Sequence, residues 1–111
     1  MEIKFDEKFE ECLFNKSIKV SQYGRVMDMK NNILKQTIYK RYFIVEDPSD
    51  KYPYERVHRL VALTWLKDGY KKGMVVHHKD GNGFNNRVDN LEWKTKENHE
   101  IDHGWEDLDN F

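Results

Sequence analysis

The stretch "VVHHKDGNGFNNRVDNLEW", residues 75–93, predicts a β-hairpin with a long polar turn. An apolar run ending in two histidines suits a first strand over 74–78, and "RVDNLEW" (87–93) suits the return. Asparagine tolerates left-handed backbone and hydrogen-bonds its own chain, and glycine is unrestricted there, so both residue types favour a turn. We expect the turn to be shaped by Asn82, Asn85, Asn86, Gly81 and Gly83.

A helix is predicted to follow the hairpin over residues 96–103, with Thr95 as its N-cap and Gly104 just beyond its end. A spacing of four residues places His99 and His103 on one face of that helix. Four of the five histidines therefore lie within a single predicted ββα unit. Neutral imidazoles suit a transition ion such as Zn, Ni or Mn and leave coordination positions open for water or phosphate.

Each histidine can also be interpreted as a residue that neither binds metal nor takes part in catalysis. His99 and His103 could belong to a polar helix face, together with the acidic residues around them. His77 and His78 are neighbours on a strand and point to opposite faces, so they cannot easily bind the same ion. That alternation favours one metal ligand and one base. His58 lies on an apolar helix, and we interpret it as a structural residue.

The chain before the hairpin is predicted to be rich in β-strand and to end in a buried helix. The predicted fold class is α+β, as a single domain over 1–111, with a β-rich N-terminal part at about 1–55 and a ββα motif at about 74–104. The expected elements are a short helix over 6–14, two strands over 18–29 broken near Tyr23–Gly24, a turn at 31–32, a strand over 33–45, a loop over 46–55 and a helix over 57–66.

The composition fits one soluble domain. Among 111 residues, 38% are hydrophobic and 35% are charged, which allows a modest core under a polar surface. A single cysteine, Cys12, excludes an internal disulfide and a Cys-rich zinc knuckle, and it suits a reducing cytosol. The acidic start, "MEIKFDEKFEE", does not resemble a signal peptide, and no stretch approaches the roughly 20 apolar residues of a membrane span.

Charge is unevenly distributed along the chain, although the net charge is only −1. Residues 15–45 hold seven basic residues against one acidic residue, whereas residues 97–111 hold six acidic residues and no lysine or arginine. A basic middle between acidic ends can attract phosphate locally. On charge alone, a solvated mixed surface is an equally good interpretation.

These residues resemble the HNH endonucleases, whose unit is a ββα-metal fold. The three residues of the name correspond to His78, Asn90 and His99, at intervals of twelve and then nine residues, as in the phage and intron-encoded branch. "HKDGNGFNNRVDNLEW" (78–93) is similar to the hairpin of that branch, and "VHRLVALTW" (57–65) to its preceding helix. "IKVSQYGRV" (18–26) resembles its N-terminal element, so the resemblance covers about residues 18–103.

The metal site departs from that branch. Many relatives have Asp where His77 stands and Asn where His99 stands. With His103 added, the set resembles the colicin-type HNH nucleases, which use three histidine ligands. The resemblance thus implies one divalent ion (Zn, Ni, Mn or Mg) held by His77, His99 and His103. The homing endonucleases often carry C-terminal DNA-reading modules, and because these 111 residues contain no segment that resembles one, we do not expect a long recognition site.

The resemblance implies a DNA endonuclease that hydrolyses phosphodiester bonds, by nicking or by double-strand cleavage. His78 would act as general base, Asn90 would hold His78 in position through its amide, and the metal would neutralise charge on the phosphate. We expect the protein to be a cytoplasmic monomer or homodimer, encoded by a phage or mobile element. Contacts to flanking phosphates are expected from Lys79, Arg87, Lys94 and Lys96.

Two other classes of function also fit parts of this sequence. A DNA-binding module with a structural zinc site would use a closed set of four ligands that includes His78. An interaction domain without metal would leave His77, His99 and His103 individually replaceable. The nuclease is favoured because Asn90 has no role in either alternative.

Overall fold

The computed structural model describes residues 6–95, which form eight strands and one α-helix. Short 3₁₀ turns lie at Lys67–Gly69 and Val88–Asn90. The elements are β1 (Phe9–Cys12), β2 (Asn15–Ser21), β3 (Val26–Asp28), β4 (Thr37–Tyr39), β5 (Tyr42–Val45), β6 (Glu55–Arg56), α1 (Val57–Trp65), β7 (Met74–His78) and β8 (Leu91–Thr95).

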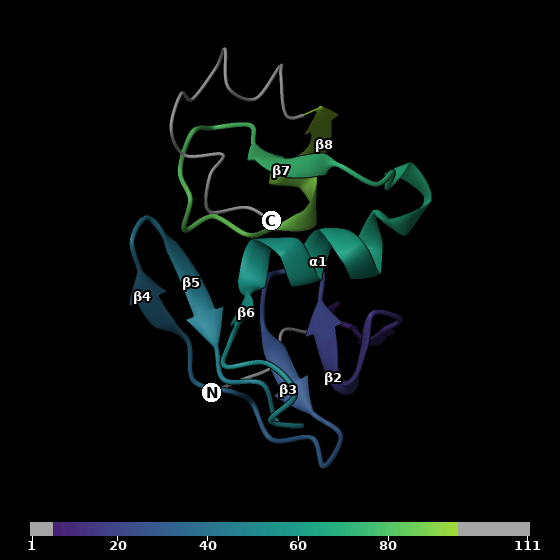
Figure 1. The fold of residues 1–111 in the computed structure, drawn as a ribbon, viewed down its shortest axis with the longest axis vertical. Helices are drawn as coiled ribbons and strands as arrows, with labels where there is room; N and C mark the ends of the chain where they lie inside the picture. Colours follow the sequence, from purple (N-terminus) through teal and green to yellow (C-terminus); the bar gives the residue numbers. More distant parts are fainter. Residues whose placement is uncertain (1–5, 96–111) are drawn as a thin grey trace.

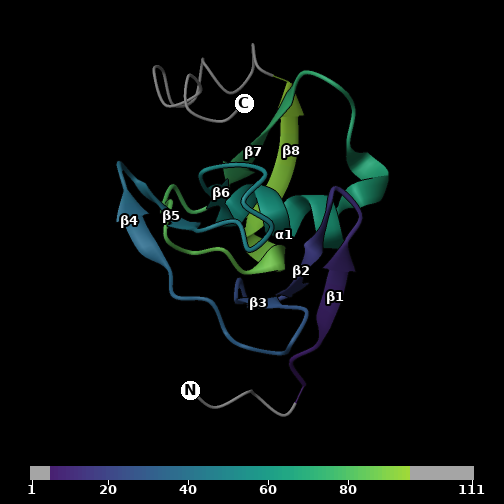
Figure 2. The same cartoon turned by 60° about the horizontal axis from the view of Figure 1, so that its bottom comes forward.

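The strands form three small antiparallel sheets around the helix. Their orders are β1-β2-β3, β4-β5-β6 and β7-β8. In Figure 1, α1 crosses the middle of the molecule between the β7–β8 pair and the N-terminal strands. In Figure 2 the strands of all three sheets lie around α1. The expected α+β class is confirmed.

The core is built on α1, which is buried along most of its circumference. Only Arg59 and Trp65 of its nine residues escape full burial. Nearly all-round burial fits a helix that has sheets on more than one side. The strand side chains that pack in the same cluster are Ile18, Val20, Val26, Val45, Val76 and Leu91.

Two tryptophans attach the C-terminal end of α1 to its neighbours. The indole N–H of Trp65 donates to the carbonyl of Val20 on β2 at 2.9 Å. The indole N–H of Trp93 on β8 donates to the carbonyl of Leu66, just after the helix, at 2.8 Å. Because an indole is large and has one donor, each contact combines apolar burial with a satisfied hydrogen bond.

The expected helix over 6–14 is wrong: the structure has strand β1 there. Glu10 and Glu11 pair with Val20 and Lys19 of β2. A nine-residue helix is too short to be stable alone, so hydrogen bonding to the adjacent strand decides the conformation. Leu13 is 59% exposed in the turn between β1 and β2.

The single strand expected over 33–45 is instead a hairpin of β4 and β5. Tyr39 pairs with Tyr42, and the turn between them places Lys40 at φ 58°. Left-handed backbone is uncommon for lysine, so the residue types here gave no turn signal. The loose strand-like alternation of residue types runs through both β4 and β5, because the turn between these strands takes up only two residues.

The other elements agree with expectation. The strands expected over 18–29 are β2 and β3, broken at the turn that contains Tyr23 and Gly24. The helix expected over 57–66 is α1, and the hairpin over 74–93 is β7 and β8. The predicted helix over 96–103 lies outside the described residues. No helix within residues 6–95 is long and apolar enough to span a membrane.

Candidate active site

The hairpin of β7 and β8 places the histidine pair at the end of a strand. His77 lies opposite Glu92 and His78 opposite Leu91. Because side chains alternate along a strand, His78 shares a face with Val76, which packs in the core on α1. His77 lies on the other face and is 9% exposed. The expected division of the two histidines between two faces follows from this register.

The imidazole of His78 is held from two directions. Its Nε2 lies 2.8 Å from Oδ1 of Asn86, in a partly buried hydrogen bond. Its ring also packs against the ring of His58, with 5.2 Å between centroids. His58, interpreted as structural, is 1% exposed and also contacts Tyr42 with centroids 5.1 Å apart.

The turn between the strands is organised by the carboxylate of Asp80. Its Oδ1 accepts from the backbone N–H of Asn82 at 2.8 Å and from the amide of Asn90 at 2.9 Å. Its Oδ2 accepts from the amide of Asn85 at 2.9 Å. These donors, first of all Asn85, lower the pKa of Asp80 to about 2. The turn is therefore held by an ionised carboxylate at any pH near neutrality.

Asn90 was expected to hold His78 through its side-chain amide, and the hydrogen bonds of that side chain lie within the turn. Its amide donates to Asp80 and to the carbonyl of Asn85, and its Oδ1 accepts from the backbone N–H of Asp80. Its own carbonyl accepts from the N–H of Lys79 at 2.8 Å. Asn90 thus links the two ends of the turn. These hydrogen bonds go to residues of the turn and not to the imidazole of His78.

Asn86 is the residue that sequence reasoning missed. It was expected only to shape the turn, yet its side chain contacts His78 and is 5% exposed. Nothing in the local sequence separates Asn86 from Asn85, which stands beside it and binds Asp80. The path of the turn decides which of the two faces the imidazole.

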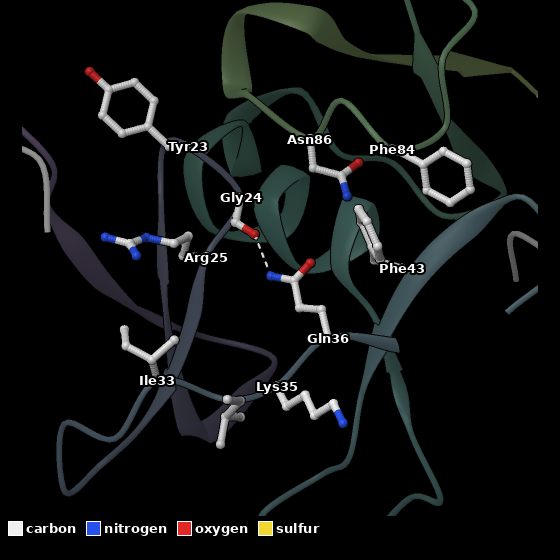
Figure 3. A pocket seen from close by; sticks show the side chains of 10 residues that line it. Tyr23, Gly24, Arg25, Ile33, Lys35, Gln36, Phe43, Phe84 and Asn86 are labelled. Carbon is white, nitrogen blue, oxygen red and sulfur yellow. Dashed lines mark hydrogen bonds between the residues drawn. The ribbon is translucent and has the colours of Figure 1, made fainter. Parts of the chain in front are cut away.

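The N-terminal turn between β2 and β3 packs directly on this loop. Gly24 has φ +86°, and a Cβ there would lie 2.9 Å from Cβ of Asn86. Nearby, the backbone N–H of Val88 donates to the carbonyl of Gln22 at 2.9 Å. Figure 3 shows the hydrogen bond from the amide of Gln36 to the carbonyl of Gly24, at 2.8 Å.

A cavity of about 720 Å³ lies between this N-terminal turn and the hairpin loop. In Figure 3 the amide nitrogen of Asn86 points into it, near the ring of Phe43. That nitrogen has no hydrogen-bond partner among residues 6–95. Phe43 and Phe84 line the same cavity, with ring centroids 5.0 Å apart.

The expected metal ligands lie only partly in the described chain. Residues 6–95 contain no group of three His, Cys, Asp or Glu side chains arranged to hold an ion. His77 is the one expected ligand that the structure describes, and His99 and His103 lie outside the described residues. The face of β7 opposite α1 presents His77, so a metal there would be separate from the face that holds His78.

The expected phosphate contacts have different surroundings. Lys79 is exposed at the turn, and Lys94 is half-buried on β8. The guanidinium of Arg87 lies 4.3 Å from the ring centroid of Tyr23 and 3.7 Å from the carboxylate of Asp89. Lys96 lies outside the described residues. Within the basic segment 15–45, Arg25 is paired with Glu7 at 2.7 Å, which neutralises that charge.

Sequence and structure comparisons give one consistent family. Residues 55–101 match the family model described as HNH endonuclease. A protein of Acanthamoeba polyphaga mimivirus named as uncharacterized HNH endonuclease L245 is 36% identical over 98 residues, covering 84% of this chain and 29% of the relative. DNA endonuclease I-HmuI of Bacillus phage SP01 is 54% identical over 41 residues, covering 37% of this chain and 23% of that protein.

The fold agrees with these matches. A solved structure titled as DNA binding and cleavage by the HNH homing endonuclease I-HmuI superposes with a TM-score of 0.71 at 32% identity. The match covers 87% of this chain and 59% of the solved chain. The chain spans less than a third of the length of the curated relatives that it matches.

Proposed function

This chain belongs to the HNH endonuclease family, and on that premise we propose that it hydrolyses phosphodiester bonds of DNA with the help of a divalent cation. The observation that carries the proposal is the position of His78. Its imidazole stands at the end of β7 and is fixed by Asn86 and His58, beside a turn that Asp80 and Asn90 hold.

Hydrolysis of a phosphodiester requires an activated water molecule and stabilisation of negative charge on the phosphate and the leaving oxygen. We assign the first task to His78 as general base, because an imidazole titrates near neutral pH and accepts a proton from a bound water. A base is effective only when its ring is held in a fixed orientation, and the contacts of His78 with Asn86 and His58 support such a role.

The cation would supply the charge stabilisation, as metal ions do in phosphoryl chemistry. His77 fits such a role, since it is an imidazole on the face of β7 that His78 does not occupy. We propose His99 and His103 as the other two ligands. Among Zn, Ni, Mn and Mg, three imidazoles would favour the softer ions over Mg.

DNA would be held through its phosphates by basic side chains near the hairpin. We propose Lys79, Arg87, Lys94 and Lys96 for these contacts, with support from the exposed lysines of the basic segment 15–45. Phosphate contacts fix the register of the protein on the duplex without reading its sequence.

A cleavage assay on supercoiled plasmid with a panel of Mg, Mn, Zn and Ni tests the proposal. We expect conversion to nicked or linear DNA with at least one ion, none in excess EDTA, and a loss of about 100-fold or more in His78→Ala. The control is Leu13→Ala, an exposed residue in the turn between β1 and β2, which is expected to cleave as the wild type does. Tight DNA binding without cleavage under any ion would instead indicate a DNA-binding module with a structural metal.

A further inference from the structure

We propose that the cavity between the N-terminal turn and the hairpin loop binds one nucleobase of a DNA strand, with the amide of Asn86 at the edge of the base and the ring of Phe84 at its face. The proposal rests on the proposed function, since it assigns the cavity to the substrate DNA. Its basis is a buried amide nitrogen that points into a cavity of about 720 Å³ and has no hydrogen-bond partner among residues 6–95.

The amide nitrogen of Asn86 requires an acceptor. The residue is 5% exposed, and Figure 3 shows its Nδ2 turned into the cavity. A buried N–H without a partner costs free energy, so such groups are nearly always matched by the protein, by water or by a ligand. Because Nδ2 only donates, the ligand must present an oxygen or an unprotonated ring nitrogen. Nucleobases carry such acceptors at their edges.

The wall of the cavity favours a flat ligand with apolar faces. Phe43 and Phe84 line it with ring centroids 5.0 Å apart, together with Ile33 and Leu34. Phe84 is 41% exposed, so part of its ring is open to a ligand. Water can satisfy the amide alone, whereas a base also stacks on an aromatic ring. The volume lies in the range of sites for small organic ligands, which is about 300–1,000 Å³.

The cavity also adjoins the groups proposed to hold and cleave DNA. The other end of the Asn86 amide, Oδ1, lies 2.8 Å from Nε2 of His78. Tyr23 lines the cavity and stacks with Arg87, one of the proposed phosphate contacts. The exposed Lys35 lines it as well. A strand bound through its phosphates by these basic side chains would pass beside the cavity.

Contacts between distant parts of the chain hold the two sides of the cavity in place. Gly24 approaches so closely that a Cβ there would lie 2.9 Å from Cβ of Asn86. At the other side, a Cβ on Gly83 would overlap the backbone carbonyl of Arg41, in the turn between β4 and β5. The hairpin loop is therefore fixed at both sides before DNA binds, and a preformed site avoids the cost of ordering a loop.

Binding of single-stranded DNA with and without bases tests the contact with Phe84. The probes are a short oligothymidylate and an abasic strand of the same length, measured by fluorescence anisotropy in excess EDTA. Phe84→Ala is expected to weaken binding of the oligothymidylate about 10-fold and to leave the abasic strand unaffected, because stacking is lost and charge is not. Equal weakening of both strands, or of neither, overturns the proposal.

The matched control is Phe14→Ala. Phe14 is a phenylalanine with 56% exposure in the turn between β1 and β2, and it does not line the cavity. This variant is expected to bind both strands as the wild type does. A loss for the oligothymidylate as large as that in Phe84→Ala would place the base contact elsewhere and overturn the assignment to the cavity.

The side-chain amide of Asn86 reports the other contact in the wild-type protein. Its N–H₂ group gives its own pair of signals in a nitrogen-15 correlation spectrum of the metal-free protein. We expect these signals to shift with the oligothymidylate and to stay in place with the abasic strand. The amide of Asn82, exposed in the same loop, is the control and should respond to both strands alike. Asn86 signals that also respond alike to both strands overturn the proposal.

The base site and the nuclease can fail separately, because neither binding measurement needs cleavage. A protein that cleaves with no metal but passes both tests keeps the base site and contradicts the proposed function. A protein that cleaves DNA while Phe84→Ala and the Asn86 amide give no base-dependent response keeps the nuclease and loses the base site.

Discussion

Arg87 stacks on Tyr23, with its guanidinium carbon 4.3 Å from the centre of the ring. The arginine belongs to the return of the hairpin and the tyrosine to the turn between β2 and β3, so the contact joins the two halves of the molecule. A planar guanidinium on an aromatic face keeps several N–H donors at its edge, where a phosphate can reach them.

Arg87→Ala should weaken DNA binding and reduce the salt dependence of the affinity by about one unit of the log–log slope, as expected for one lost phosphate contact. Arg87→Lys retains the charge and should keep most of that slope, although it loses the stack on Tyr23. Fluorescence anisotropy on a short duplex at several salt concentrations measures both. An unchanged slope in Arg87→Ala would exclude Arg87 from the phosphate contacts.

Gly24→Ala should destabilise the protein more than the same substitution at another glycine that has a similar φ. Gly24 and Gly73 have φ of +86° and +89°, but a Cβ at Gly73 meets nothing within 4 Å. Gly73→Ala therefore reports the backbone penalty alone, about 1–2 kcal/mol. Gly24→Ala adds the overlap with Asn86, for a total of about 2–4 kcal/mol.

Chemical denaturation of the two variants gives the comparison. Equal losses in the free energy of unfolding would mean that the loop around Asn86 yields to the added methyl group. The close approach would then exert no constraint on that loop.

Asp80 should make the stability of the turn depend on acid. Its pKa is lowered from 3.8 to about 2 by hydrogen bonds, first of all from Asn85. Because the folded pKa is the lower one, the stabilisation is complete above 3.8 and is lost as the pH falls through about 2. The Tm difference between wild type and Asp80→Asn should stay constant above about pH 4 and shrink below it. A difference that persists unchanged to the lowest pH would show that the carboxylate charge contributes nothing.

Removal of an imidazole ligand should lower metal affinity in a way that distinguishes ligand from base. Calorimetric titration of Zn or Ni is expected to show binding weakened by about 10-fold or more in His77→Ala and in His103→Ala. His78→Ala should bind the metal nearly as the wild type does, since His78 lies on the other face of β7. Coincident isotherms for wild type and His103→Ala would make His103 a surface residue.

The parts of the fold that follow local patterns could be predicted from the sequence. The hairpin of β7 and β8 and the helix α1 have apolar periodicity and turn residues that act over a few positions. Strand β1 could not be predicted in this way, because its conformation depends on pairing with β2. The turn at Lys40 could not either, since its residue types carry no turn signal.

In the candidate site too, some features follow from local sequence patterns and others depend on contacts between distant residues. The position of His78 at the end of a strand follows from the hairpin alone. Which asparagine contacts the imidazole of His78, Asn86 or Asn90, depends on the path of the turn, which Asp80 and the contact with Gly24 determine. Spacing along the chain does not contain that information.

The close approach of Gly24 to Asn86 also has a consequence for recombination. A chimera that joins residues 55–95 of this chain to the leading segment of a related protein inherits a loop that packs where position 24 has no side chain. Unless the donor also supplies glycine there, the added side chain overlaps Asn86, and the loop that contacts His78 must shift. Gly24 lies before this boundary and Asn86 lies after it. This pair of residues therefore limits which leading segments can be joined to residues 55–95.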